Sequence, residues 1–342
     1  MTLTGKVNSD IFLSGKNPFT KEKNAYGNEK IKNIDASRMT SKQFLGGNKL
    51  DNSIIAGSGG GSLWGGSGGN DTLVGGAGKD IFYYAANNGN DTVEKFTAGT
   101  SSKSDVLTLY KGAGLKTFTR TGEKIIFKMS DNGKLTVVTS GGDVDDAIQY
   151  STDGAKTSAI KIGNTASDNT FSYVEKIFRY YGSKNHKDTI EITGDKNIDV
   201  RLSKKTFSNL DVIDASDSTG KNNLYGNGAE NTIKAGTGTN TLWGGSGTAN
   251  DTLIGNDGTD KFYYGKNQGN DVIKNSGDGD YIRLYNIREN DISSTETIGK
   301  SGVKLNIGAG SLTVNETEGV TFILKGGARY SYNAGTNKFG KA

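Results

Sequence analysis

The 342-residue sequence has no cysteine, one proline and one histidine. Without cysteine the chain can form neither a disulfide framework nor a thiolate metal site, and one histidine cannot build a zinc site from several imidazoles. The 41 basic and 37 acidic residues leave a net charge of +4, which is too small to indicate nucleic-acid binding by itself. No apolar run approaches the roughly 18 residues that a transmembrane helix needs, so we expect no membrane insertion.

An N-terminal secretory signal is also missing. Residues 1–6 (MTLTGK) contain no apolar stretch of the kind that such signals require. We therefore expect either an intracellular chain or export by a route that does not read the N-terminus. The lack of cysteine suits an extracellular chain that never relies on disulfides, although intracellular chains can lack cysteine too.

Glycine, in contrast, is abundant: the chain contains 51 glycines, about twice ordinary usage. There is no three-residue glycine period, so the composition does not indicate collagen. Hydrophobic residues make up 32% of the chain, which is little for a single thick core. We expect a thin core with many tight turns.

The sequence contains one module twice. Residues 45–93 align with residues 224–273, with one inserted residue in the second copy, and more than half of the aligned positions are identical. Weaker similarity continues on both sides, which predicts two tandem modules, 1–165 and 166–342. No long non-repeated segment remains for a separate catalytic domain, so we do not expect an enzyme.

Short apolar runs rich in β-branched and aromatic residues, interrupted by glycine, asparagine and aspartate, predict an all-β fold. A helical period is hard to find. We consider a short helical turn at three places only, residues 41–45, 170–181 and 204–210.

A period of about nine residues runs through the glycine-rich part of each module. Residues 75–83 fit the pattern G-G-x-G-x-D-x-U-x at every fixed position, where U is a large apolar residue. Residues 255–263 fit it with Asn256 in place of one glycine, and the preceding units, 65–74 and 244–254, carry the aspartate one or two residues late. Several such units in tandem, in both modules, are a specific signal.

These nonamers resemble the RTX, or hemolysin-type calcium-binding, repeat family. The segments that follow them, 88–96 and 269–273, are similar to the tail that ends such repeats. The resemblance implies a right-handed parallel β-roll in each module, flanked by further strands, with consecutive nonamers on opposite edges and Ca²⁺ between coils. It also implies type I secretion, with a signal near residues 319–342, and therefore an extracellular or cell-surface location.

The pattern also has a physical basis of its own. Glycine permits positive φ and lets stacked turns approach closely. Aspartate beside loop carbonyls offers hard oxygen ligands, which suit Ca²⁺ better than softer metals. The U positions are expected to point inward and form the core; they are Leu63, Leu73, Phe82, Leu242, Leu253 and Phe262.

Two aspartate pairs are the best candidate metal ligands. Asp71 precedes Asp91 by the same separation as Asp251 precedes Asp271, so each pair should flank one edge of a roll on successive coils. We predict that these four carboxylates bind Ca²⁺. The alternative is that aspartate, asparagine and glycine hold the turns by local hydrogen bonds without any metal.

Asp80 and Asp260 are the corresponding candidates on the other edge. Gly61 and Asn240 stand where their partner carboxylates would lie. We therefore expect the edge with Asp80 and Asp260 to bind Ca²⁺ weakly or not at all.

Other possible sites favour plainer explanations. His186 lies in a polar segment without a nucleophile-elbow motif, so a surface turn is a better interpretation than a catalytic triad. Residues 57–61 lack the lysine and the following helix of a phosphate-binding loop. The aromatic residues could contact glycans or a partner, although packing is favoured; they are Trp64, Trp243, Tyr83, Tyr84, Tyr263 and Tyr264.

The function predicted from these observations is structural. Stacked repeats expose an unpaired strand edge at each end, and the sequence offers little apparent capping. We predict a secreted Ca²⁺-binding protein that assembles head-to-tail with its own copies into an extracellular filament, matrix or surface layer. The alternatives are an adhesin that recognises a cell-surface glycan, and the C-terminal β-roll of a larger RTX hydrolase or toxin; the initial methionine argues mildly against the latter.

Overall fold

The structure is a computed structural model. It describes residues 1–5, 10–15, 28–99, 101–110, 113–140, 147–152, 158–162, 170–173, 179–182, 187–204 and 206–342. His186 lies outside the described residues. The contacts divide the chain into two compact units: unit 1 comprises Met1–Ser167 and Glu175–Tyr180, and unit 2 comprises Asp168–Val174 and Tyr181–Ala342. Each is described by itself.

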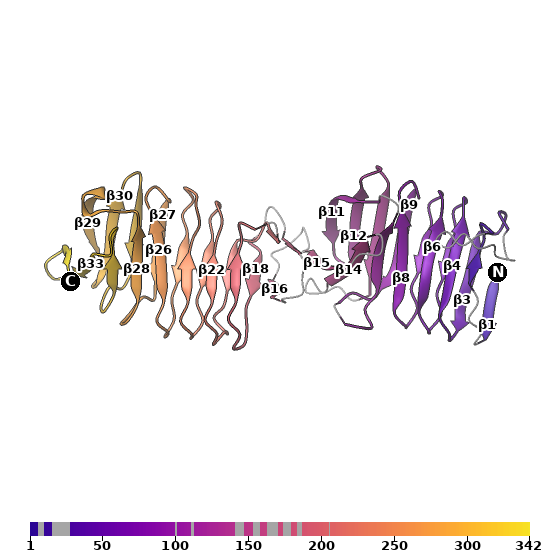
Figure 1. Cartoon of the computed structure of the whole chain (residues 1–342), viewed down its shortest axis with the longest axis horizontal. Helices are drawn as coiled ribbons and strands as arrows, with labels where there is room; N and C mark the ends of the chain where they lie inside the picture. Colours follow the sequence, from indigo (N-terminus) through magenta and orange to yellow (C-terminus); the bar gives the residue numbers. More distant parts are fainter. Residues whose placement is uncertain are drawn as a thin grey trace. The chain divides into compact units, whose positions relative to one another are not determined.

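Unit 1 is a roll of two sheets between which the chain alternates, as Figure 1 shows. Its coil strands pair in parallel. The first sheet has the order β1 (Thr2–Gly5), β3 (Asn33–Met39), β5 (Ser53–Ile55), β7 (Thr72–Val74), β9 (Asn90–Phe96), β13 (Lys134–Thr139), β12 (Lys124–Met129) and β11 (Leu115–Thr121). The second runs through β2 (Ile11–Phe12), β4 (Gln43–Asn48), β6 (Gly61–Gly66), β8 (Asp80–Ala85), β10 (Val106–Tyr110), β14 (Ala147–Thr152) and β15 (Ser158–Ile162).

Unit 2 repeats this architecture with shorter coil strands. Its first sheet has the order β16 (Thr170–Ser172), β18 (Thr189–Glu191), β21 (Val212–Asp214), β23 (Thr232–Lys234), β25 (Thr252–Ile254), β27 (Asn270–Lys274), β31 (Gly310–Val314), β30 (Gly302–Ile307) and β29 (Ile292–Ile298). The second has β19 (Asp199–Arg201), β22 (Asn223–Tyr225), β24 (Thr241–Trp243), β26 (Lys261–Gly265), β28 (Tyr281–Tyr285), β32 (Thr321–Ile323), β33 (Arg329–Asn333) and β34 (Lys338–Lys341). Two further short strands are β17 (Arg179–Tyr181) and β20 (Phe207–Ser208).

The predicted all-β fold is confirmed, and each unit is a parallel β-roll. The one helical element in the described residues is a 3₁₀ turn, η1 (Glu289–Asp291). The three possible helical turns were wrong where they can be checked: residues 43–45 belong to β4, residues 207–208 form β20, and the described part of 170–181 contains β16 and β17. In β4 the buried Gln43 and Leu45 flank the half-buried Phe44, which is the alternation of a strand.

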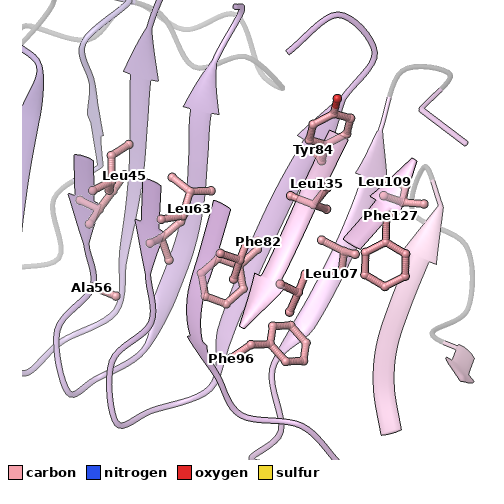
Figure 2. Packing of buried hydrophobic residues seen from close by; sticks show 14 of the residues in the cluster. Leu45, Ala56, Leu63, Phe82, Tyr84, Phe96, Leu107, Leu109, Phe127 and Leu135 are labelled. Atoms are coloured by element: carbon pink, nitrogen blue, oxygen red, sulfur yellow. The ribbon is translucent and has the colours of Figure 1, made fainter. Parts of the chain in front are cut away.

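A narrow core runs between the two sheets of each roll. In unit 1, Leu45, Leu63, Phe82 and Leu107 are paired in register on successive strands, and each is at most 1% exposed. Figure 2 shows these side chains along the interior of unit 1. The inward orientation predicted for the U positions is confirmed, because all six are at most 1% exposed; they are Leu63, Leu73, Phe82, Leu242, Leu253 and Phe262.

The expectation of little capping was wrong at one end of each roll. After the last parallel coil the sheets of unit 1 continue into the antiparallel strands β13–β12–β11 and β14–β15. Unit 2 ends in β31–β30–β29 and β32–β33–β34, again antiparallel. These strands cover the parallel edge because longer strands with local turns can close a stack without repeating its nonamer pattern.

We expect Leu242→Ala to lower the free energy of unfolding by about 2–5 kcal/mol. Leu242 is fully buried and lies in register between Leu224 and Phe262, so its truncation leaves a cavity in the core between the two sheets. Urea denaturation in saturating Ca²⁺ measures the change. Thr241→Ala, at the outward neighbour, is the control and should cost under about 1 kcal/mol. Equal losses in the two variants would contradict the proposed core.

Candidate metal sites

Buried carboxylate and amide side chains form a ladder along one edge of unit 1. Asn52, Asp71 and Asp91 each stand immediately before or within the start of a strand in the first sheet, and each is at most 3% exposed. The backbone N–H of Asn52 donates to Asp71 Oδ1 at 2.8 Å, and that of Asp71 donates to Asp91 Oδ1 at 3.0 Å. The carboxylate of one coil therefore accepts the hydrogen bond of a backbone N–H group on the coil before it.

Unit 2 carries the same ladder. The N–H of Asn231 donates to Asp251 Oδ1 at 2.8 Å, and the N–H of Asp251 donates to Asp271 Oδ1 at 3.0 Å. The structure thus brings together both predicted pairs, Asp71 with Asp91 and Asp251 with Asp271, on successive coils. The hydrogen bonds are those that the metal-free alternative invokes, and they occupy one oxygen of each carboxylate.

The other edge contains a second ladder. Asp80 N donates to Asp105 Oδ1 at 2.7 Å in unit 1. In unit 2, Asn240 N donates to Asp260 Oδ1 at 3.0 Å, and Asp260 N donates to Asp280 Oδ1 at 2.7 Å. Asp80 and Asp260 therefore each have a carboxylate neighbour on the following coil.

Asp105 and Asp280 were missed by the sequence reasoning. They follow Asp80 and Asp260 by 25 and 20 residues. Both lie beyond the last nonamer, where the nine-residue period no longer marks them. The signal that could have found them is the aspartate that opens each of the two similar segments 105–107 and 280–282.

The aspartates differ in whether their second carboxylate oxygen has a hydrogen-bond partner. On the second edge the other carboxylate oxygen of Asp105, Asp260 and Asp280 accepts a further backbone N–H. On the first edge, Oδ2 of Asp71 and Asp91 is buried and has no hydrogen-bond partner among the described residues. Asp80 also keeps one such oxygen. A buried carboxylate oxygen without a donor is costly, and a cation removes that cost.

Burial sets the protonation of these groups. It raises the pKa of Asp71, Asp80 and Asp271 to about 7 and that of Asp91 to about 8, because a charged carboxylate loses its hydration. The neighbouring carboxylate on the adjacent coil adds repulsion to Asp91 and Asp271. The same groups would be fully ionised beside a divalent cation.

Glycine makes room for the first-edge carboxylates. A Cβ placed on Gly65 would lie 2.0 Å from Asp71 Oδ2, and one on Gly244 would lie 2.1 Å from Asp251 Oδ2. Only glycine lets the turn backbone approach the carboxylate so closely. No cluster of three or more acidic or histidine side chains that could hold a metal occurs among the described residues. A bound cation would therefore need backbone carbonyls beside the paired aspartates, which is a donor set that Ca²⁺ accepts.

Comparison with known families identifies the repeats. The model of the RTX calcium-binding nonapeptide repeat matches four stretches, residues 47–81, 55–93, 217–249 and 246–273. The chain carries RTX calcium-binding repeats. All six aspartates that we predicted as metal ligands lie within the matched stretches, and Ca²⁺ is the ion that this repeat binds.

Other comparisons give less. No curated protein matches the sequence. Among solved structures, the extracellular lipase LipA from Serratia marcescens is similar at 13% identity and a TM-score of 0.19, over 80% of this chain. The chain spans 37% of the length of that lipase. Among the residues that the structure describes, no helix is long and apolar enough to cross a membrane.

We expect the Ca²⁺-free protein to lose thermal stability as the pH rises from 5 to 8. The unfolded chain has aspartate pKa values near 3.9, whereas the folded values reach about 7 to 8 at Asp71 and Asp91. The folded state therefore binds more protons in this interval, and the stability present at low pH is lost as these carboxylates ionise. Differential scanning calorimetry in metal-free buffers measures the effect.

The double variant Asp71→Asn/Asp91→Asn is the control for this profile. It keeps the two Oδ1 acceptors and removes the two titrations, so its melting temperature should vary less with pH between 5 and 8. A melting temperature of the unmodified protein that rises over the same interval would contradict the assignment of buried, raised-pKa carboxylates.

Proposed function

We propose that this RTX protein is a secreted structural protein whose two β-rolls complete their folding when they meet extracellular Ca²⁺. The observation that supports this most directly is the buried first-edge ladder with unpartnered Oδ2 atoms at Asp71 and Asp91. Ionised and without a cation, these neighbouring carboxylates destabilise the coil stack; with Ca²⁺ they link successive coils.

Asp71 and Asp91 would hold the ion in unit 1, and Asp251 and Asp271 would hold it in unit 2, together with carbonyl oxygens of the turns. Ca²⁺ supplies charge neutralisation there. Binding to the folded state alone stabilises it by mass action, about 2.7 kcal/mol when free Ca²⁺ is a hundredfold above the Kd. Low Ca²⁺ inside a cell would then delay folding until export, which is consistent with a type I route and with the secretion that RTX repeats are associated with.

A non-catalytic role suits the site. On the second edge Asp105, Asp260 and Asp280 use both oxygens to hold backbone N–H groups, which leaves these three little freedom to bind a substrate. The same ladder would serve equally well in the β-roll segment of a larger RTX protein, and that stays the alternative to an independent structural protein.

Head-to-tail assembly is the finer part of the proposal. Among the described strands, β1 pairs with β3 alone, and β29 and β34 each pair on one side only. The outer edges of these strands are the surfaces on which another copy could add by strand pairing. Because each roll ends in antiparallel strands, a copy added at β29 or β34 would pair with a hairpin strand and would not continue the nonamer coils.

Calcium titration tests the first proposal. Isothermal titration of Ca²⁺ into chelator-treated protein should give heat, and millimolar Ca²⁺ should raise the melting temperature at pH 7.5. Asp91→Asn should weaken Ca²⁺ binding in unit 1 by at least tenfold, because it removes a charged ligand while keeping the Oδ1 hydrogen bond to Asp71. Glu123→Gln, at an exposed carboxylate of the same unit, is the matched control. No heat and no shift in melting temperature would remove the Ca²⁺-dependent function.

Electron microscopy and sedimentation, each with Ca²⁺ and with chelator, test the assembly. We expect filaments or sheets in Ca²⁺ and dispersed chains in chelator. Introducing positive charge on the edge strand β29, for example by Thr295→Lys together with Thr297→Lys, should reduce assembly without changing the Ca²⁺ affinity. Uniform monomers under both conditions would overturn self-assembly while leaving the calcium proposal intact.

A further inference from the structure

The outward face of the second sheet of unit 2 carries an ordered row of side chains. Register pairing places Arg201, Tyr225, Trp243, Tyr263 and Arg283 opposite one another on β19, β22, β24, β26 and β28. Neighbouring strands lie about 4.8 Å apart, so these side chains form one continuous line along the roll. Three aromatic rings occupy its middle, and a guanidinium group stands at each end.

The aromatic rings of the row are half-buried and border a hollow. Tyr225, Trp243, Tyr263, Gln268 and Tyr285 line a hollow of about 370 Å³. Tyr285 is 59% exposed, unlike most large apolar side chains of the described chain. A cluster of partly exposed aromatic rings around a hollow is the kind of surface that binds a flat, partly apolar ligand.

Polar groups hold the rings in place. Trp243 Nε1 donates to Gln268 Oε1 at 3.2 Å, and the same oxygen accepts the N–H of Gly265. The guanidinium of Arg201 lies 4.1 Å from the centre of the Tyr225 ring and makes two bonds to Asp199, at 2.8 and 2.9 Å. A surface that is ordered before binding loses less entropy when a ligand arrives.

On the corresponding face of unit 1, a phenylalanine ring occupies the space that Tyr225 takes in unit 2. Its counterpart of Tyr225 is Gly46, where an added Cβ would lie 2.5 Å from Phe12 Cδ1. The Phe12 ring, 1% exposed, packs edge-on against Phe44, and Phe44 stacks on Tyr83 at 5.6 Å. Packing therefore accounts for the aromatic residues of unit 1, whereas in unit 2 Arg201 lies over Tyr225 and a hollow lies beside Trp243 and Tyr263.

The charge around the open row is positive. The basic residues of this face are Arg201, Lys204, Lys261, Arg283 and Arg329, and its exposed carboxylates are Asp199 and Asp278. Arg201 and Lys204 form ion pairs with Asp199. Among the described residues, Arg283 and Arg329 form no ion pair. Arg283 is followed along the row by Arg329, through Ile323. The cations left over complement an anionic ligand.

We propose that this face of unit 2 binds a linear acidic polysaccharide. Trp243 and Tyr263 would pack against the apolar faces of pyranose rings, the NH₂ group of Gln268 would donate to hydroxyl groups, and Arg283 would pair with a uronic carboxylate. A single-stranded nucleic acid also has flat rings and negative charge, but one phosphate per nucleotide calls for a denser track of cations than this row provides. The proposal goes beyond the calcium function and does not depend on self-assembly.

Binding of a hyaluronan decasaccharide to the whole chain in saturating Ca²⁺ tests the proposal by calorimetry. Trp243→Ala should lower the affinity at least tenfold. Trp64→Ala, at the same position of unit 1, is the matched control and should leave it unchanged. Arg283→Gln should lower the affinity for hyaluronan at least fivefold while leaving any weak binding of neutral cellohexaose unaffected.

The melting temperature of each variant in Ca²⁺ checks its folding. Tyr285→Ala serves as a second probe of the hollow, because an exposed side chain can be removed without disturbing the core. Undetectable hyaluronan binding, equal effects of Trp64→Ala and Trp243→Ala, or tighter binding of a single-stranded oligonucleotide than of hyaluronan would each overturn the proposal. None of these results would bear on the Ca²⁺ titration, so the two proposals fail separately.

Discussion

The structure depends on the hydrogen bond that a buried carboxylate makes to the backbone of the preceding coil. Many strands of the rolls are three residues long, so each offers few ladder bonds of its own. The bonds from Asp71 N to Asp91 and from Asp251 N to Asp271 tie one coil to the next at a separation of 20 residues. This same arrangement buries negative charge, which raises the pKa of the carboxylates and makes the coils sensitive to any cation that can reach them.

Close backbone approach imposes the second constraint. Gly66 and Gly245 adopt φ of 133° and 130°, and a Cβ on either would lie within 1.8 Å of a carbonyl oxygen on the coil before. Glycine at the turns and apolar residues at the strand centres are therefore fixed by geometry in both units. The outward positions carry no such requirement. The two copies differ there: Gly46 of unit 1 corresponds to Tyr225 of unit 2.

The sequence predicts what repeats and misses what does not. The inward positions and the first-edge aspartates follow from the nine-residue period, because each coil must solve the same packing problem. Asp105 and Asp280 lie past the last nonamer and were not predicted. The flanking strands were predicted from their apolar runs, but their antiparallel pairing, which closes each roll, was not, because the nine-residue period ends before them. The family model likewise covers only the repeats.

The tyrosine pairs show a limit of a different kind. Tyr84 and Tyr264 were grouped with the possible contact residues, yet both are 1% exposed and donate to the carbonyls of Gly89 and Gly269. The alternation from Phe82 would have placed Tyr84 inside, since side chains two apart share a face. Composition drew attention to the aromatic residues, but only strand periodicity separates those that pack from those that are available to a ligand.

The open aromatic row and the buried ladder are linked through the coils. Tyr225, Trp243 and Tyr263 come from three successive coils, so their alignment requires the register that Asp251 and Asp271 help to set on the same stack. A ligand that binds the aligned row favours the stacked coils, and so does an ion that neutralises the ladder. Two ligands that prefer the same state of a protein strengthen each other's binding by equal factors. The proposed binding of an acidic polysaccharide to the outer face of unit 2 is therefore expected to be strongest where Ca²⁺ is abundant. In both units the packing of the coils fixes the inward residues, whereas the outward residues could differ between the two copies.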